Sequence, residues 1–313
     1  MDGSGEGSLR EVVVAPDIVY GRKLGMALTM DLYRPANRNG AAVLFMNSGG
    51  FESGKLTQYV EEEPCRYRAL APDELTVDGS PEPIPLLSQF SFAPLLGRGF
   101  TVIDVRHGSG PRFTLEEIVS DVRRAVRFVR CHCQRFDVDP QRIGLWGASA
   151  GGFLAVFLGV TGDGGDRAAQ DPVERTACEV AVVATYYAAG YDFAVDAERF
   201  PEVIASLPSL QMDREVLAAH SIRPHIDADA PPTLIVYGTD DFPFITGACE
   251  SIHADLEAAG VESRLVALEG TGHEFSGEDG FHAHHAQRAV DEVEAWFSKF
   301  LSAEPIGEQS PVD

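Results

Sequence analysis

The sequence has little positive charge and very few lysines. Its 313 residues contain 25 lysines and arginines against 48 acidic residues, which gives a formal net charge of −23 at pH 7. Only Lys23, Lys55 and Lys299 are lysines. Proteins that bind nucleic acid or anionic membranes do so through clustered basic side chains. The charge therefore argues against nucleic acid and against a membrane surface as partners.

The sequence also lacks a long apolar run and a disulfide framework. No run approaches the roughly 20 residues that a membrane helix needs, and the polar stretch Met1–Arg10 lacks the apolar core of a signal peptide. The five cysteines are odd in number and scattered, which suits a reducing compartment. We expect a cytoplasmic location, with disordered ends at residues 1–10 and 302–313.

Two tracts rich in metal-binding residue types lack the spacing of a metal site. Cys131–Cys133 (CHC) falls in a predicted helix, where residues i and i+2 point to different faces, and no second Cys/His pair follows at zinc spacing. His282–His285 (HAHH) opens the predicted last helix, where a solvated helix start is the simpler interpretation. We expect neither a metal nor a cofactor.

Short apolar runs alternate with predicted helices along the chain. Two β-rich runs come first, Glu11–Val19 and Leu24–Tyr33. The later runs are continuously apolar, as in strands buried on both faces of a parallel sheet: Ala41–Met46, Phe100–Val105, Arg142–Trp146, Val180–Ala184, Thr233–Tyr237 and Arg264–Leu268. The clearest helix, Thr114–Phe136, opens with a capping box. This alternation predicts one α/β domain over residues 11–301, with a doubly wound, mostly parallel sheet.

Two stretches interrupt this alternation. Residues 52–89 are rich in proline and contain an acidic run, and residues 186–230 mix aromatic and acidic side chains. Long insertions inside a compact domain are usually functional. We expect a lid or cap over the site, with Phe51, Tyr186 and Tyr187 lining the substrate pocket; the alternative is surface excursions without a role.

The pentapeptide Gly147–Gly151 has the pattern G-x-S-x-G. It follows an apolar strand and precedes a helical stretch, which is the strand–turn–helix of a nucleophile elbow. Ser149 must adopt a strained conformation to project its hydroxyl, so its neighbours need almost no side chain. The helix behind it aims backbone N–H groups at the site. A glycine-rich turn without chemistry fits this context less well, so Ser149 is the candidate nucleophile.

A serine hydroxyl needs a base, and the base needs a residue that orients it. In chains with this elbow the order is serine, acid, histidine. His273 lies in a loop directly after a predicted strand, whereas His253 falls in a predicted helix. Asp240 and Asp241 both follow the strand Thr233–Tyr237, so either could be the acid.

A turn with two glycines, Asn47–Phe51, directly follows the first buried strand. Gly49 and Gly50 would let the backbone approach a substrate and donate N–H bonds to a developing oxyanion. Ala150, the residue after the nucleophile, would supply another N–H. Such turns are common, so the oxyanion interpretation of this one depends on its place at a strand end upstream of the elbow.

With these motifs the sequence resembles the α/β-hydrolases of the acetyl-esterase/feruloyl-esterase type, close to the hormone-sensitive-lipase group. The resemblance covers roughly residues 17–301 apart from the insertions. It rests on DLYRP (31–35), NSGGF (47–51), DPQRIGLWGASAGG (139–152), PPTLIVYGTDD (231–241) and GTGHEF (270–275).

The resemblance implies the α/β-hydrolase fold and a triad of Ser149, Asp241 and His273, with Asp241 selected by the G-x-x-D spacing after its strand. It also implies oxyanion donors at Gly49, Gly50 and Ala150, although family members have His-Gly-Gly-Gly where this chain has NSGG (47–50). The implied activity is cleavage of small-molecule carboxylic esters through an acyl-enzyme, without a cofactor.

Other functions share some of these features. Peptidases or amidases of the prolyl-oligopeptidase type have the elbow but usually carry a large N-terminal propeller, for which this chain has no room. A non-catalytic ligand-binding protein on the same fold would normally lack a triad member. An acyltransferase or C–C hydrolase would look the same in sequence. The oligomeric state stays open, with a homodimer as one option.

Overall fold

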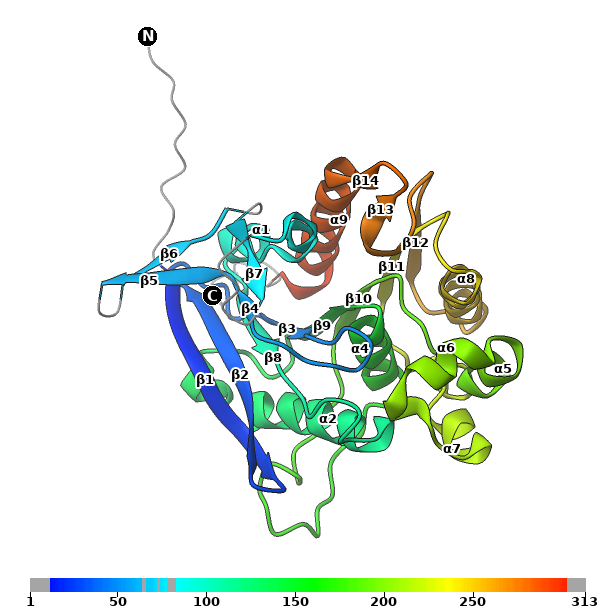
Figure 1. The fold of residues 1–313 in the computed structure, drawn as a ribbon. Coiled ribbons are helices and arrows are strands. Elements are labelled where there is room, and N and C mark those ends of the chain that lie inside the picture. Colours follow the sequence, from blue (N-terminus) through cyan, green and yellow to red (C-terminus); the bar gives the residue numbers. More distant parts are fainter. Residues whose placement is uncertain (1–11, 64–65, 72–73, 78–82, 303–313) are drawn as a thin grey trace, which may run out of the picture.

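An eight-stranded sheet forms the centre of the protein (Figure 1). The computed structural model describes residues 12–63, 66–71, 74–77 and 83–302. The expected disordered ends, apart from Ser302, lie outside these residues. The strand order is β1-β2-β8-β3-β9-β10-β11-β12. Among the described residues, no helix combines the length and apolar character needed to cross a membrane.

The sheet is antiparallel at one edge and parallel elsewhere. The first two strands form a hairpin, and the second also pairs antiparallel with β8. All remaining pairs are parallel. The strands are β1 (Val12–Lys23), β2 (Met26–Pro35), β8 (Thr101–Val105), β3 (Ala42–Met46), β9 (Ile143–Ala148), β10 (Val182–Tyr186), β11 (Thr233–Gly238) and β12 (Ser263–Leu268). Strands β3, β8, β9, β10 and β11 are buried along their whole length, which confirms the predicted doubly wound, mostly parallel sheet.

Helices cover both faces of this sheet. Helices α1 (Ala93–Gly97) and α9 (Ala283–Leu301) contact each other and lie over one face, while α2 (Leu115–Cys131) and α4 (Ala150–Val160) contact each other and lie over the opposite face (Figure 1). Helix α8 (Pro243–Ala258) packs against β11 and β12.

The helix predicted over Thr114–Phe136 is present, but it ends earlier than expected. Its capping box forms as predicted between Thr114 and Glu117. Helical geometry is lost at His132, whose imidazole contacts the carbonyl oxygen of Phe128 at 2.8 Å, and a separate short helix, α3 (Cys133–Phe136), follows. The same carbonyl also accepts the backbone N–H of His132 at 3.1 Å, so the ring and the last turn of the helix share one acceptor.

Both insertions contain small elements of regular structure. In the first, these are β4 (Leu56–Thr57), β5 (Tyr59–Glu63), β6 (Arg66–Ala69), β7 (Thr76–Val77) and the 3-10 helix η2 (Pro85–Phe90). In the second, they are α5 (Phe193–Arg199), α6 (Pro201–Ser206), η3 (Pro208–Leu210), α7 (Arg214–Ala219) and η4 (Arg223–His225). The loop after β12 holds η5 (His273–Phe275), β13 (Ser276–Gly277) and β14 (Gly280–Phe281).

Candidate active site

Ser149 lies at the junction of β9 and α4 in a strained backbone conformation, with φ 53° and ψ −119°. A positive φ is uncommon for a residue with a side chain. The turn requires glycine on both sides. A Cβ atom at Gly147 would collide with the carbonyl of Gly151, and one at Gly151 would collide with the carbonyl of Met46. The sharp turn projects the Ser149 hydroxyl away from the strand, as expected of a nucleophile elbow.

The structure brings His273 and Asp241 to Ser149. Nε2 of His273 lies 3.2 Å from Oγ of Ser149, and Nδ1 lies 3.0 Å from each carboxylate oxygen of Asp241. The Asp241 side chain is 0% exposed, and its Oδ1 also accepts the N–H of Phe242 at 2.6 Å. The imidazole packs on the rings of Tyr187 and Phe242, with centroids 4.6 and 5.6 Å away. The carboxylate therefore holds the ring with Nε2 toward the hydroxyl.

The two neighbouring aspartates after β11 have different environments. Asp240 is exposed, and its carboxylate accepts a hydrogen bond from Thr239 at 3.1 Å. Only Asp241 of this pair contacts His273. His253 lies on α8, as predicted, and its Nδ1 is 2.9 Å from the Ser263 hydroxyl.

The turn after β3 differs from the arrangement that the resemblance implies. Gly49 donates its N–H to the carbonyl of Glu52 at 2.9 Å, and Glu52 returns a bond of the same length. Gly50 and Phe51 between them have φ of 56° and 67°, as in tight hairpin turns. The Gly49 N–H is therefore engaged, and Gly49 does not fit the role of oxyanion donor.

Two other backbone N–H groups remain candidates for this role. Among the described residues, the N–H groups of Gly50 and Ala150 have no hydrogen-bond partner. Both residues line the same cavity as Ser149 and His273. Ala150 is the first residue of α4, where backbone N–H groups have no partner inside the helix. This pair is placed to hold a developing negative charge.

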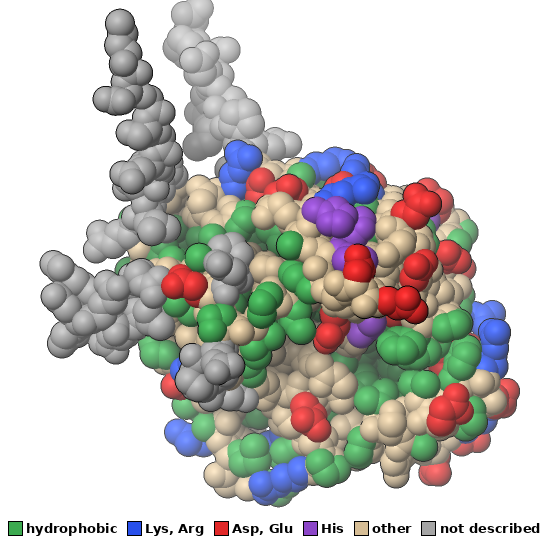
Figure 2. Space-filling view, turned by 45° about the horizontal axis from the view of Figure 1, so that its top comes forward, with side chains coloured by type: hydrophobic (Ala, Val, Ile, Leu, Met, Phe, Trp, Pro, Cys, Tyr) green, Lys and Arg blue, Asp and Glu red, His purple; other side chains and the backbone are tan. Residues whose placement is uncertain are grey.

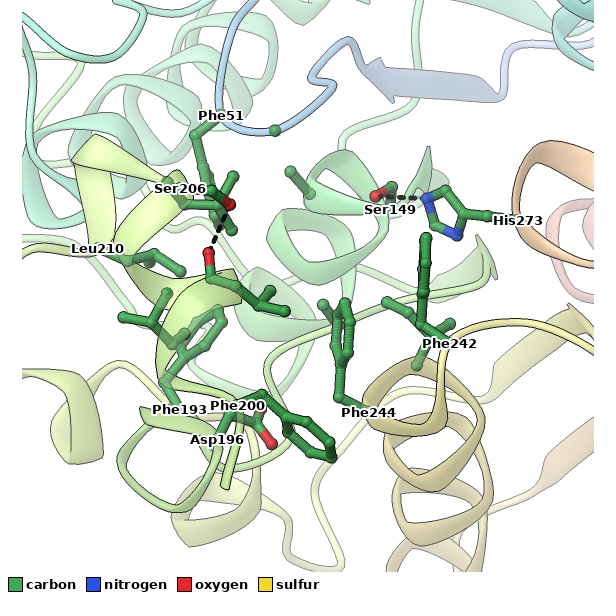
Figure 3. A pocket seen from close by; sticks show the side chains of 17 residues that line it. Phe51, Ser149, Phe193, Asp196, Phe200, Ser206, Leu210, Phe242, Phe244 and His273 are labelled. Carbon is green, nitrogen blue, oxygen red and sulfur yellow. Dashed lines mark hydrogen bonds between the residues drawn. The ribbon is translucent and has the colours of Figure 1, made fainter. Parts of the chain in front are cut away.

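Two cavities meet at Ser149. The first, which we call the helix-side cavity, has a volume of about 250 Å³, and Figure 3 shows its lining. Its walls come mostly from the second insertion and the start of α8 and include Phe193, Phe200, Leu207, Leu210, Phe242 and Phe244. In the space-filling view, hydrophobic side chains gather around a hollow with acidic side chains nearby (Figure 2).

The hairpin-side cavity lies on the other flank and has a volume of about 260 Å³. Its lining comes from the turn after β3, from the first insertion and from the loop after β12, and includes Asn47, Glu52, Leu56, Leu86, Tyr187 and Glu274. The two cavities together offer space on both sides of a carbonyl group bound at Ser149.

The three residues expected in the substrate pocket have different places. Phe51 lines the helix-side cavity and Tyr187 the hairpin-side cavity. Tyr186 lines neither. Its ring is fully buried against Trp146 and Phe275, because its neighbour Tyr187 takes the position that faces the site. We therefore leave Tyr186 out of the pocket.

Comparison with known proteins places the chain in a family. The sequence profile of the BD-FAE family matches residues 87–254, more than half of the chain. The chain belongs to the BD-FAE family. The resemblance to esterases of the α/β-hydrolase type, inferred from the sequence motifs, is thereby confirmed.

Similar sequences extend over parts of this BD-FAE family member. The probable carboxylic ester hydrolase LipM of Mycobacterium tuberculosis is 28% identical over 151 residues, 46% of this chain and 34% of LipM. The probable isoprenylcysteine alpha-carbonyl methylesterase ICME of Oryza sativa subsp. japonica is 25% identical over 191 residues, 57% of this chain and 45% of ICME. The chain thus spans less than half the length of these curated relatives.

Solved structures share the fold over nearly the whole chain. The acetyl ester-xyloside bifunctional hydrolase of Caldicellulosiruptor lactoaceticus matches with a TM-score of 0.67 at 19% identity, covering 95% of this chain and 98% of that chain. Propionate-bound Est2, an esterase of Thermogutta terrifontis, matches with 0.65 at 21%, covering 96% and 98%. With the sheet order, these likenesses confirm the α/β-hydrolase fold of this BD-FAE family member.

A buried carboxyl group supports the turn after β3 in this family member. The amide of Asn47 donates to the carbonyl of Gly54 at 2.8 Å and to Asp104 at 3.3 Å. Asp104 is fully buried in β8. Burial raises the pKa of Asp104 to about 7, against the opposing effect of Arg106, which lies 3.7 Å away and also pairs with Asp31 at 2.8 Å.

The sequence analysis did not identify Asp104 or a second acidic residue, Asp196. Asp104 is the single acidic residue in the apolar run Phe100–Val105, and that contrast could have marked it. Asp196 lines the helix-side cavity, and its place in an irregular insertion gave no such signal. Within the described ranges, no group of three or more His, Cys, Asp or Glu side chains could hold a metal ion.

Proposed function

We propose that this protein is a serine esterase that cleaves carboxylic esters of small molecules. The observation that carries the proposal is the chain of contacts from the buried Asp241 carboxylate, through His273, to the Ser149 hydroxyl. This arrangement suits the activation of a hydroxyl of high pKa for attack on a carbonyl carbon. LipM and ICME, which carry esterase names, support the reaction class.

The proposed reaction has two halves. Ser149 attacks the ester carbonyl while Nε2 of His273 takes its proton, and the N–H groups of Gly50 and Ala150 stabilise the oxyanion. His273 then gives its proton to the leaving alcohol, and an acyl-enzyme remains on Ser149. Water activated by the same imidazole attacks this acyl group and releases the acid. Asp241 keeps the ring in the required tautomer and stabilises the imidazolium.

The two insertions are proposed to form a cap that shapes the substrate site. Nine residues of the second insertion, Ala189, Phe193, Asp196, Phe200, Val203, Ile204, Ser206, Leu207 and Leu210, line the helix-side cavity. Residues of the first insertion line the hairpin-side cavity. The hydroxyl of Tyr187 donates to Gln89 at 2.7 Å and joins the two segments. We infer that one cavity receives the acyl group and the other the alcohol. A cytoplasmic location remains our inference from the cysteines.

A matched set of substrates tests the reaction class. p-Nitrophenyl esters of graded acyl length and the p-nitroanilides of the same acyl groups are compared. An esterase should prefer each ester over its anilide by orders of magnitude. Comparable rates on both would favour an amidase or peptidase, and binding without turnover would favour a ligand-binding protein.

Substitution of the nucleophile gives the second test. Ser149→Ala should leave the fold intact, lower ester turnover by about 10⁴–10⁶ and abolish labelling by a fluorophosphonate. His273→Ala should be similarly damaging, whereas His253→Ala, which changes a contact to Ser263 outside the site, serves as the matched control. Retention of even a tenth of the turnover in the Ser149 variant would reject the mechanism.

A further inference from the structure

Asp196 is the one acidic side chain among the described residues that line the helix-side cavity. It lies in the first turn of α5 and is partly buried. Figure 3 shows it beside Phe200, at the end of the cavity away from Ser149. A substrate arm that starts at the reacting carbonyl and fills this cavity would therefore end near the carboxylate.

The Asp196 carboxylate has no partner among the described residues. Within the described ranges no hydrogen bond or ion pair reaches it, and most of the side chains that line the cavity are apolar. The hydroxyl of Ser206, which also lines the cavity, donates to the carbonyl of Val203 at 2.7 Å and is already used. Burial raises the pKa of Asp196 to about 6, with Asp192 adding to the effect and Arg199 opposing it. At neutral pH the cavity therefore holds an unpaired negative charge.

The chemistry of this cavity selects a particular kind of ligand. An apolar wall stabilises a hydrocarbon chain, but further desolvation of a bare carboxylate by a neutral chain end costs free energy. An ammonium group at the chain end supplies both a counter-charge and hydrogen-bond donors. The net charge of −23 also favours the approach of a cation.

We propose that Asp196 is a specificity-determining residue that binds a cationic amine at the end of an otherwise apolar substrate arm. The inference rests on the proposed esterase function and deepens it: the preferred substrate is an ester with an ω-ammonium group on the arm that enters the helix-side cavity.

A purely structural role for Asp196 is the competing explanation. An acidic residue near a helix N-terminus interacts favourably with the helix dipole. That role would affect the stability of α5, yet it would not distinguish substrates by charge. Glu198 provides a matched control because it lies on the same helix but is exposed and pairs with Arg214 of α7, outside both cavities.

The kinetic test uses pairs of esters that differ only at the chain end. Esters with ω-amino acyl groups of increasing length are compared with methyl-ended esters of equal length, and a second series carries the amine on the alcohol. In the wild type, kcat/KM should favour the amine in one series. Asp196→Asn should lower the ratio of amino-ended to methyl-ended kcat/KM by about 10- to 100-fold. Glu198→Gln should leave the ratio unchanged.

A binding measurement separates the inference from the proposed reaction. Calorimetry compares n-hexylammonium with the charge-reversed n-hexanoate on Ser149→Ala protein, with and without Asp196→Asn. Tighter binding of the amine that depends on Asp196 supports the inference even if no ester is cleaved. Hydrolysis of neutral esters without an amine preference in either series would overturn the inference while leaving the esterase function standing. Equal effects of Asp196→Asn and Glu198→Gln on the ratio would also overturn it.

Discussion

Gly49 and Glu52 exchange two backbone hydrogen bonds of 2.9 Å across the turn that follows β3. This exchange engages the Gly49 N–H, one of the three N–H groups that the family resemblance assigns to the oxyanion hole. It also fixes Gly50 at φ 56°, beside the nucleophile. The two adjacent glycines therefore have different roles. Gly49 supports the loop, whereas the N–H of Gly50 has no partner among the described residues.

This division predicts different effects of alanine at the two positions. Gly49 has an ordinary φ, and a Cβ there would meet nothing within 4 Å, so Gly49→Ala should change kcat by less than about threefold. Gly50→Ala would strain the positive φ and displace the donor, with a loss of kcat toward the roughly 10²–10³ seen when an oxyanion donor is removed. The check is kcat on a p-nitrophenyl ester.

The control for backbone strain is Gly260→Ala. Gly260 has φ +80° and open space around it, and it lies in the loop after α8. Gly260→Ala should lower the melting temperature without lowering kcat. Equal losses of kcat in the Gly49 and Gly50 variants would show that our assignment of the donor is wrong.

Much of the fold and most of the proposed catalytic residues could be predicted from the sequence because both depend on local patterns. Buried parallel strands read as continuous apolar runs, and the elbow needs glycine at fixed positions around Ser149. The choice of Asp241 as the partner of His273 followed from the family resemblance, through its G-x-x-D spacing after β11, and the residues alone left Asp240 equally possible. The structure separates these two aspartates by exposure.

Other features depend on contacts between distant segments and could not be predicted. The engagement of Gly49 depends on the conformation of its turn, which the pair Gly-Gly permits but does not specify. The lining of the helix-side cavity depends on how α5, α6 and η3 pack, and these helices are too short to give a clear periodic pattern. Tyr186 and Tyr187 are both aromatic, and only the backbone at the end of β10 determines which one faces the site.

The two cavities predict separable changes in substrate preference. Leu207→Trp places a bulkier side chain in the helix-side cavity and reduces its free volume, and Leu86→Trp does the same in the hairpin-side cavity. One variant should lower kcat/KM most for esters with long acyl groups, and the other for esters with bulky alcohols, each by about 10-fold or more. The measurement is a two-way matrix of acyl length against alcohol size. If both variants shift the same axis, the division into acyl and alcohol cavities is wrong.

The raised pKa of Asp104 predicts that the free energy of unfolding depends on pH. In the unfolded chain its carboxyl ionises near the ordinary value of 3.8, whereas burial raises the pKa to about 7 in the folded protein. Between these values the folded state retains a proton that the unfolded state has lost. Rising pH from about 4 to 7 therefore lowers the free energy of unfolding through this group, and the loss is complete above about 7.

Asp104→Asn removes this ionisation and can keep a polar contact to Asn47. The variant should gain stability relative to the wild type as pH rises from 5 to 8, by at most about 3 kcal/mol. Urea unfolding at a series of pH values measures the difference, and the exposed Asp229→Asn serves as the control. A difference that is constant with pH would contradict the raised pKa of Asp104.

The aspartate pair after β11 gives the sharpest test of the proposed mechanism. Asp241 is buried, and both of its oxygens lie 3.0 Å from Nδ1 of His273, so Asp241→Asn keeps the size of the side chain but removes the charge that selects the reactive tautomer. We expect kcat to fall by about 10³–10⁴. Asp240→Asn changes an exposed carboxylate that contacts Thr239, and it should lower kcat by at most about tenfold. Because the residues are adjacent and undergo the same substitution, general effects of charge on the loop should be similar in both. A crippling Asp240→Asn beside a mild Asp241→Asn would mean that the loop adopts another register in the working protein and that Asp240 orients His273.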